Sequence, residues 1–478
     1  MNGARAYRFL LALLVPLGAC TPPTNANDMS GSLDSAVASD LLPPPRELGI
    51  VDLGPPDLSA IADLSETVDG KALGDLTTSD MAGRVSPFCA LPGSVVWAQG
   101  KATVVGGALD GGAATDLRFM HLPDGYCAHF FANVGNARQL RFAPGGELFV
   151  ASPTRGTTGG GANGLAAVVI LPDDNADGVG DAPITFLGNL GATQGIAFAP
   201  GFFYYQDNAK ILRLPYKAGD RAPAGASTLV TTITIYNSGL HWPKPIDIAD
   251  DGTIYVGNGG DQGEACDPLL PFHGGILKLD GAPGGTPVAR GLRNPIALRC
   301  ARGHDRCFAL ELAQDYSAMM GGREKMIPIH GGDDWGYPCC ATQNLPYMGL
   351  MPVPNCAAVT PESASFIIGD TPFGVDFETG LWPAPYTGSA FVALHGAFGT
   401  WQGAKMVAIK MDPATGLPLP GTDLQGKPTG AMSDFAIGWD DNSLSHGRPA
   451  AVTFAADGRL FLSNDNNGDI VWIAPVGL

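Results

Sequence analysis

The chain has 478 residues and carries 46 acidic against 28 basic side chains, a formal net charge of −18. Because no basic stripe could neutralise phosphate groups, this balance argues against nucleic-acid binding. The 66 glycines and 40 prolines, together with few long helical patterns, favour a domain built from short strands and turns.

The first twenty residues are typical of an export signal. Two arginines precede an apolar run from Phe9 to Ala19, which is too short to span a bilayer. The run ends in small residues directly before Cys20, a pattern that resembles the lipobox of bacterial lipoproteins. We therefore expect residues 1–20 to be a lipoprotein signal peptide, Cys20 to be lipidated, and the lipid to be the only membrane anchor. An ordinary signal peptide that happens to contain a cysteine is the alternative.

Residues 21–86 differ in composition from the rest of the chain. They are rich in proline, serine and aspartate, and they include eleven acidic and three basic residues. Low aromatic content and like charges predict a disordered linker between the membrane and the globular part. Thr21, rather than an aspartate, follows Cys20, which favours anchoring at the outer membrane, facing the periplasm or the exterior.

Eight further cysteines are present, an even number in an exported chain, and they predict up to four disulfides. Cys300 and Cys307 flank a turn and could close a hairpin, whereas the adjacent Cys339 and Cys340 could pair elsewhere or with each other. Zinc binding is the alternative, but the spacing lacks a C-x2-C pair and an accompanying histidine pair. The eight are Cys89, Cys127, Cys266, Cys300, Cys307, Cys339, Cys340 and Cys356.

A short hairpin pattern recurs along residues 87–478. Each copy has an apolar strand, a turn and a second apolar strand, and the Asp-Gly or Gly-Gly turns supply the positive φ angles that tight hairpins need. Clear copies lie at 140–151, 196–205, 246–256 and 452–462, and weaker ones at 296–310 and around 390–394.

Six such units of about 65 residues each predict an all-β domain, a six-bladed β-propeller over residues 87–478. An array of β-sandwiches is the alternative, but the linkers that it would need are not visible. In a propeller the loops of all blades converge at the ends of the axis, so we expect the function there.

Four loop motifs stand out in this region. They are G-L-R-N-P-I-A-L at 291–298, G-G-D-D-W-G-Y-P at 331–338, Y-T-G-S-A-F-V-A-L-H-G at 386–396 and R-P-A-A-V-T-F-A-A-D-G at 448–458. In this order they resemble motifs of the glucose/sorbosone dehydrogenase family, although the second has Tyr and Trp exchanged and one residue added. Members of that family are soluble six-bladed propellers that oxidise sugars with pyrroloquinoline quinone (PQQ). The resemblance spans about residues 115–478.

The resemblance implies a catalytic role for His241, which precedes the hairpin at 246–256 as the catalytic histidine of the family does. A neutral imidazole would accept the proton of the sugar hydroxyl while hydride passes to the quinone. Arg293 and Asn294 would contact the quinone, where a guanidinium can stabilise the negative charge of the reduced ring. His241 and Arg293 are therefore the predicted catalytic residues.

The resemblance implies three further cofactor contacts. Arg448 matches a second arginine of the family and would pair with a cofactor carboxylate. His395 lies about where some relatives have a lysine beside the cofactor. Gln194 is a candidate on an alignment that needs a gap.

Calcium is the metal that the resemblance implies, because it bridges quinone oxygens and backbone carbonyls. Relatives have a Glu-Gln-Gly-Pro-like turn where this chain has Glu311-Leu-Ala-Gln314, so Ala313 and Gln314 are the expected carbonyl ligands. Glu324 holds the place of a family glutamate that binds a second, structural calcium. Residues 173–178 begin like a calcium loop but have Ile184 at the twelfth position, and we interpret them as a polar turn.

The predicted function is a PQQ-dependent dehydrogenase that oxidises an aldose or a related sugar aldehyde or polyol. Its electrons would pass to a periplasmic acceptor, a cytochrome or a quinone. Two alternatives stay open. One is a lipid-tethered propeller that binds a glycan or a protein partner without catalysis. The other is a calcium-dependent lactonase, which would need side-chain carboxylate and amide ligands converging on the axis.

Overall fold

Strands joined by tight turns make up nearly all of the regular structure, and one short 3-10 helix, η1 (Leu117–Phe119), accompanies them in the described part of the chain. The predicted signal peptide 1–20, Cys20 and the linker 21–86 lie outside the described residues. No helix among the described residues is long and apolar enough to cross a membrane. The computed structural model describes residues 87–106, 115–153, 166–236, 241–260, 266, 272, 274–303, 306–314, 321–362, 364–397, 400–422, 426–441 and 446–478.

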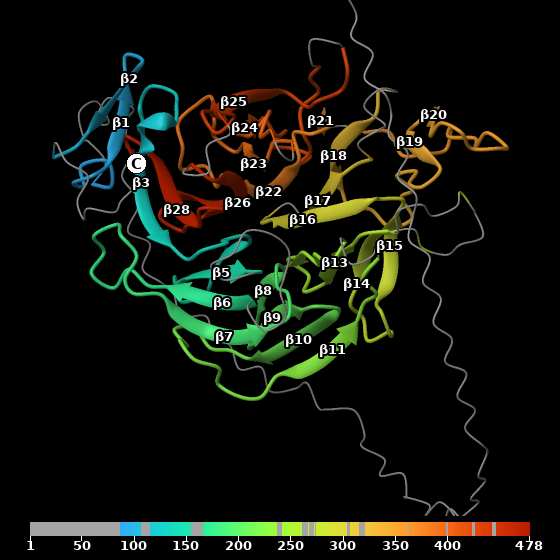
Figure 1. Ribbon diagram of the computed structural model, residues 1–478, viewed down its shortest axis with the longest axis horizontal. Helices are drawn as coiled ribbons and strands as arrows, with labels where there is room; N and C mark the ends of the chain where they lie inside the picture. The colour runs from blue at the N-terminus through green and yellow to red at the C-terminus, as the bar shows by residue number, and fades with distance from the viewer. Residues whose placement is uncertain are drawn as a thin grey trace, which may run out of the picture. The chain divides into compact units, whose positions relative to one another are not determined.

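All described strands but β19 (Cys340–Thr342) and β20 (Leu345–Pro346), which form a separate two-stranded sheet, belong to six antiparallel sheets that follow one another along the chain (Figure 1). From the innermost strand outward, the first sheet consists of β4 (Leu140–Phe142), β5 (Leu148–Ser152), β6 (Ala166–Leu171) and β7 (Ile184–Leu190). The second consists of β8 (Ile196–Ala199), β9 (Phe202–Asp207), β10 (Lys210–Pro215) and β11 (Thr228–Thr232). The third consists of β12 (Ile246–Ile248), β13 (Ile254–Asn258), β14 (Gly275–Lys278) and β15 (Thr286–Arg290). The fourth consists of β16 (Asn294–Ala301), β17 (Arg306–Leu312), β18 (Arg323–Pro328) and β21 (Ala364–Ile367).

The fifth sheet has the same four-stranded form, and the sixth has six strands. The fifth consists of β22 (Pro372–Phe377), β23 (Ala390–Leu394), β24 (Lys405–Ile409) and β25 (Met432–Ala436). The sixth consists of β26 (Arg448–Phe454), β27 (Leu460–Asp465), β28 (Asp469–Pro475), β3 (Tyr126–Asn133), β1 (Val95–Ala98) and β2 (Lys101–Val104).

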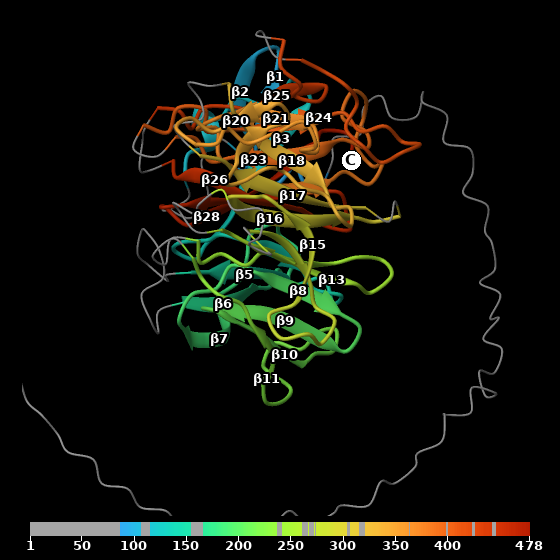
Figure 2. The same ribbon diagram turned by 90° about the vertical axis from the view of Figure 1, so that its right-hand side faces the viewer.

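The innermost strands contact one another in a closed ring, in the order β4, β8, β12, β16, β22, β26 and back to β4. The protein is therefore a six-bladed β-propeller, as predicted. Five predicted hairpins are the two inner strands of a blade, from β4–β5 in the first to β26–β27 in the last, and the weak copy around 390–394 is β23, the second strand of the fifth blade. Figure 2 shows the ring turned by 90°, with the green strands of the second blade below and the orange β23 and β24 above.

The ring is closed by a strand from the beginning of the described chain. β3 pairs antiparallel with β28 from Tyr126–Pro475 to Asn133–Asp469, and Figure 1 shows the two side by side in teal and red. The apolar core lies between neighbouring blades. Between the first and second blades, for example, Phe149, Phe186 and Phe203 pack edge to face or tilted against one another.

All eight cysteines of the propeller are paired, which confirms the disulfide prediction. Cys300 and Cys307 close the β16–β17 hairpin, where they are direct partners in register. The adjacent Cys339 and Cys340 pair elsewhere and not with each other. The remaining bonds are Cys89–Cys127, Cys266–Cys339 and Cys340–Cys356, and the last lies in an insertion between β18 and β21 that carries β19 (Cys340–Thr342) and β20 (Leu345–Pro346).

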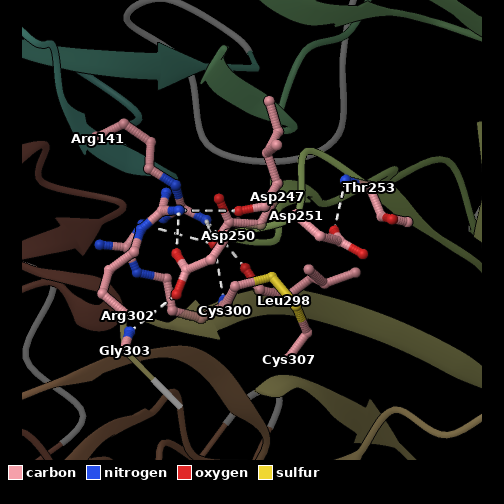
Figure 3. The surroundings of a disulfide bond; sticks show 12 residues. Arg141, Asp247, Asp250, Asp251, Thr253, Leu298, Cys300, Arg302, Gly303 and Cys307 are labelled. Carbon is pink, nitrogen blue, oxygen red and sulfur yellow. Dashed lines mark hydrogen bonds and ion pairs between the residues drawn. A yellow bond between two sulfur atoms is a disulfide. The ribbon is translucent and has the colours of Figure 1, made fainter. Parts of the chain in front are cut away.

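Buried charged side chains connect the inner strands of different blades. They lie toward the C-terminal ends of these strands. Arg299 of β16 forms a two-pronged ion pair with Asp376 of β22, with nitrogen–oxygen distances of 2.7 and 2.9 Å. Asp247 of β12 lies 3.6 Å from Arg299 and 3.9 Å from Arg141, and it accepts the N–H of Cys300. Figure 3 shows Arg141 and Asp247 beside the Cys300–Cys307 disulfide. The cluster links four blades through their inner strands.

Candidate active site

The topology gathers chemically active side chains at one end of the axis. Each blade has an even number of strands, so the chain leaves a blade at the end of the axis at which it entered. The chain therefore enters every blade at the same end of the axis, at the start of the inner strand. The second strand ends beside that start, as the pairs Asn294–Leu312, Pro372–Leu394 and Arg448–Asp465 show. We call this end, where the inner strands begin, the axial mouth. All the residues that the sequence implicates in cofactor or substrate contact lie there.

His241 is buried, 2% exposed, in the segment that leads into β12. Its Nδ1 atom hydrogen-bonds to the carbonyl oxygen of Gly260 on the loop after β13. This contact places the ring proton on Nδ1, so that Nε2 carries the lone pair of the neutral imidazole. The histidine is thus held in the tautomer that a base acting through Nε2 needs.

Gly259 and Gly260 bring His241 next to Arg293 and Asn294. A Cβ atom on Gly259 would lie 2.7 Å from the His241 Cβ and 3.0 Å from the Asn294 Oδ1, so only glycine fits between them. The Gly260 N–H donates to the Arg293 carbonyl at 2.8 Å, while its own carbonyl binds His241. The structure therefore brings together three residues that the sequence motifs predict as one site.

Arg293 faces the turn that the resemblance implies for calcium. Its guanidinium donates to the carbonyl of Ala313 at 3.2 Å, and its N–H donates to the buried carboxylate of Glu311. Glu311 is in turn paired with the buried Lys325 at 2.9 Å. The Ala313 carbonyl thus points into the mouth, and Gln314 is buried beside it in sequence.

A second cluster lies across the mouth, around Asp465. The Arg138 guanidinium is 2.9 Å from the Asp465 carboxylate, and the His395 Nε2 is 3.2 Å from it. Arg448 donates to the carbonyls of His395 and Gly396. The ring of Phe373 stacks on His395 at 4.1 Å between centroids, which fixes the imidazole plane.

Burial and charge shift the proton affinities of this cluster in opposite directions. Burial alone would raise the pKa of Asp465, but Arg138 and His395 outweigh it and hold the pKa far below its usual value. Burial lowers the pKa of His395 to about 4, although Asp465 opposes the shift. Burial also lowers the pKa of Arg448 to about 10. At neutral pH the cluster therefore holds two guanidinium cations, one carboxylate and a neutral imidazole.

Gln194 lies in the floor of the mouth. Its Nε2 donates at 2.7 Å to the carbonyl of Ile296 on β16, so the side chain reaches from the second blade to the fourth. Below it, a cavity of about 20 Å³ is lined by Arg138, Arg141 and Phe373 among others. A space of this size holds about one water molecule, so side chains close the axis beneath the mouth.

Sequence reasoning missed Arg138, Asp465 and Lys244, although the hairpin repeat contains a signal for two of them. Four side chains occupy the position two residues before a repeat copy begins, at residues 140, 196, 246 and 296. They are Arg138, Gln194, Lys244 and Asn294. This position places a side chain at the mouth in four successive blades. Asp465 could have been found only through its strand pairing with Arg448.

The mouth contains buried polar atoms that fit a polar cofactor. Within the described residues these atoms have no hydrogen-bond partner, and an unpaired buried polar atom costs about 1–3 kcal/mol. Their arrangement around two arginines suits a planar, polycarboxylated quinone such as PQQ. The atoms are Arg138 Nε, Ser152 Oγ, Thr193 Oγ1, Gln194 Oε1, Asn258 Oδ1, Arg293 Nε, Asn294 Oδ1 and Asn464 Oδ1.

The two expected calcium positions fit unequally well. The Ala313 carbonyl faces the mouth and has a second lone pair beside the one that Arg293 uses, so it suits a calcium ion held by carbonyls. Glu324 instead caps the turn before β22, where its carboxylate accepts the N–H of Thr371 at 2.6 Å. Burial raises the pKa of Glu324 well above its usual value, which disfavours the ionised form. In the described part of the chain no three His, Cys, Asp or Glu side chains are grouped to hold a metal.

Residues 173–178 form a polar turn between β6 and β7. The Asn175 side chain donates to the Asp177 carboxylate and accepts the Asp177 N–H, and Asp177 also accepts the N–H of Val179. The Asn175 and Asp177 oxygens are thus used within the turn itself, whereas Asp174 pairs with Arg221 outside it.

Several solved structures share the architecture of this chain. A Trichoderma reesei enzyme of carbohydrate-active enzyme family AA12 matches with a TM-score of 0.59 and 16% identity, over 74% of this chain and 97% of its own. The PQQ domain of pyranose dehydrogenase from Coprinopsis cinerea matches with a TM-score of 0.56 and 15% identity, over 74% and 96%. The soluble aldose sugar dehydrogenase of Escherichia coli matches with a TM-score of 0.53 and 12% identity, over 73% and 99%.

The chain has the fold of these sugar dehydrogenases. No protein-family model matches it, and no curated protein matches it either. At these identities the likeness establishes the propeller architecture, which is the fold that the sequence motifs imply.

Proposed function

We propose that the protein is a PQQ-dependent dehydrogenase that oxidises an aldose or a related sugar aldehyde or polyol. The observation that carries this proposal is the Gly259–Gly260 turn, which holds His241 against Arg293 and Asn294 amid unpaired buried polar atoms. The likeness to the PQQ domain of a pyranose dehydrogenase adds support. When bound, PQQ supplies the two-electron acceptor for hydride from the sugar carbon.

The chain's own residues divide the remaining work. His241 takes the proton of the sugar hydroxyl at Nε2, because Nδ1 is committed to the Gly260 carbonyl. Arg293 and Asn294 hold the quinone oxygens beside this base, and Arg293 stabilises negative charge there. Arg138 and Arg448 hold cofactor carboxylates at the opposite side of the mouth, with His395 and Gln194 as further contacts.

A calcium ion would be held by the carbonyls of Ala313 and Gln314, as the resemblance implies, and it would polarise the quinone. We also propose that the chain is exported, lipidated at Cys20 and held at the outer membrane by this lipid, with residues 21–86 as the linker to the propeller. Electrons would then leave for a periplasmic cytochrome or quinone. Each of these assignments has its own test, by mass spectrometry of the lipidated N-terminus or by reduction of a purified acceptor.

The test of the function is titration of the purified protein with PQQ in the presence of Ca²⁺, followed by dye reduction with a panel of aldoses. We expect micromolar or tighter binding and sugar-dependent reduction. His241→Gln should retain PQQ and lose at least about 100-fold in rate, as expected for a lost general base. His330→Gln is the matched control, because His330 is half exposed and outside the mouth, and it should retain full activity.

Absence of PQQ binding at micromolar concentration with Ca²⁺ present would contradict the dehydrogenase. A propeller that binds a glycan or protein partner without catalysis would then be the better description. Metal-dependent ester hydrolysis without PQQ would instead support the lactonase alternative.

A further inference from the structure

Lys244 is a lysine enclosed at the axial mouth. It is 0% exposed and stands at the repeat position shared with Arg138, Gln194 and Asn294. Its Nζ atom donates to the carbonyl of His241 at 3.2 Å. Among the described residues no carboxylate is paired with it, in contrast to the buried Lys325, which is paired with Glu311. A fully buried ammonium group is costly, so its placement three residues after the candidate base needs an explanation.

The segment from His241 to Lys244 is held from two sides. On one side Lys244 Nζ bonds the His241 carbonyl. On the other, the fully buried Gln206 of β9 donates to the Trp242 carbonyl at 2.6 Å and accepts the N–H of Lys244 at 3.0 Å. Together with the Gly260 contact, these bonds fix both the main chain and the ring of His241.

Lys244 brings a titratable amine next to the main chain of His241. Burial lowers the pKa of Lys244 to about 7, so the amine becomes an ammonium ion in the range where a histidine also titrates. The guanidinium of Arg138 lies 5.9 Å from the Trp242 ring and is paired with Asp465. The main chain of Arg293 bonds Gly260 and also donates to the Glu311 carboxylate. On the second blade the Asp207 carboxylate is bonded to the Gly191 N–H. Asp261 and Glu264 lie outside the described residues.

We infer that Lys244 is a positioning residue for His241. Its ammonium group holds the His241 main chain at the mouth and, as a neighbouring positive charge, opposes protonation of the imidazole. A base must be unprotonated to act, and a second cation beside an imidazole disfavours the imidazolium form. Lys244 therefore keeps His241 ready to accept a proton in mildly acidic surroundings.

The catalytic role of Lys244 rests on the proposed function, but the effect of its charge on the pKa of His241 can be measured without PQQ. The full-length protein is labelled with ¹³C-histidine, and the imidazole signals are followed by NMR between about pH 4.5 and 8.5. His241→Gln identifies the signal of His241 among the eight histidines. The variants are Lys244→Met, which removes the charge at similar length, and Lys244→Arg, which keeps it. Lys244→Gln serves as a second neutral variant should Lys244→Met not fold.

We expect the neutral variant to raise the imidazole pKa of His241 by about 1 unit, a tenfold gain in proton affinity, and Lys244→Arg to leave it near the wild-type value. With PQQ bound, the acidic limb of kcat/KM should move in the same direction. An unchanged His241 pKa in the neutral variant, or equal shifts in Lys244→Met and Lys244→Arg, would overturn the inference. Failure of PQQ to bind would count against the proposed function alone.

Discussion

Asp465 is the acid on which the second cluster of the mouth depends. It is buried, and it faces both Arg138 and His395. Removing one partner from such a group leaves an uncompensated buried charge, which costs more than the intact pair contributes. We therefore expect the residue to matter for stability.

We expect Asp465→Asn to lower the free energy of unfolding by about 3 kcal/mol, because Arg138 loses its buried carboxylate. Urea denaturation followed by tryptophan fluorescence measures this change. Asp457→Asn is the control, since Asp457 is a partly exposed turn residue, and its effect should stay within about 0.5 kcal/mol. Equal stabilities of the two variants would show that the cluster contributes nothing to folding.

Lys244 predicts an unusual dependence of stability on pH. Its pKa is lowered to about 7 in the folded protein, against about 10.4 in an unfolded chain. Between these values only the unfolded state binds the proton, so stability rises with pH across this window and is lowest below pH 7. The whole effect is at most about 5 kcal/mol.

Replacing Lys244 by Met removes this contribution. The difference in unfolding free energy between Lys244→Met and the wild type should therefore shrink by about 2–3 kcal/mol from pH 7 to pH 9. Urea titrations at the two pH values, with both proteins side by side, provide the measurement. Parallel pH profiles would mean that the amine titrates normally in the folded state.

At the scale of the strands, the charged cluster at the far end of the axis joins four inner strands. Arg299 bonds Asp376 with two nitrogens and lies near Asp247, and Asp376 also accepts the N–H of Phe454. One guanidinium thus connects the third, fourth and fifth blades directly and reaches the sixth through Asp376. It lies at the end of the axis where the inner strands finish, away from the mouth.

We expect Arg299→Met to lower the free energy of unfolding by about 3–5 kcal/mol, because two buried carboxylates lose their cation. PQQ affinity at the mouth should stay unchanged in the folded fraction. Denaturation and cofactor titration of the same preparation separate the two effects. A loss of affinity without a loss of stability would place Arg299 in the cofactor site instead.

The hairpins were largely predictable from sequence, because period-two apolar strands and glycine turns are local signals. Five of the six copies became inner strand pairs, whereas the copy around 390–394 is β23 alone, and its inner partner β22 was not predicted. His241, Arg293 and Asn294 were also predictable, since motifs carry them. Asp465 and Gln206 were not, because only strand register brings them to the mouth. The Cys266–Cys339 bond joins positions 73 residues apart and had no local signal either.

At the scale of the whole molecule, the Cys89–Cys127 disulfide ties the start of the described chain to β3, the strand whose pairing with β28 closes the ring. Cys127 lies in β3, the strand that joins the sixth blade to the beginning of the described chain. The bond spans 38 residues, and constraining a loop of that length stabilises a fold by about 4 kcal/mol.

Replacing Cys89 and Cys127 together by serine should therefore lower the free energy of unfolding by about 4 kcal/mol. The matched control replaces Cys300 and Cys307, which span only 7 residues, and should cost about 2 kcal/mol. Guanidinium denaturation of the two variants decides the comparison. A larger loss in the short hairpin would show that the closure does not depend on its disulfide.

The pairing of β3 with β28 also sets the order in which the protein can be completed. Asn133 and its partner Asn467 are separated by 334 residues, so a chain that emerges amino end first presents the edge of β3 long before its neighbour exists. Until then an open edge is available to other strands, and the last blade has nothing to complete it. The ring can therefore be completed only after β28 has been synthesised.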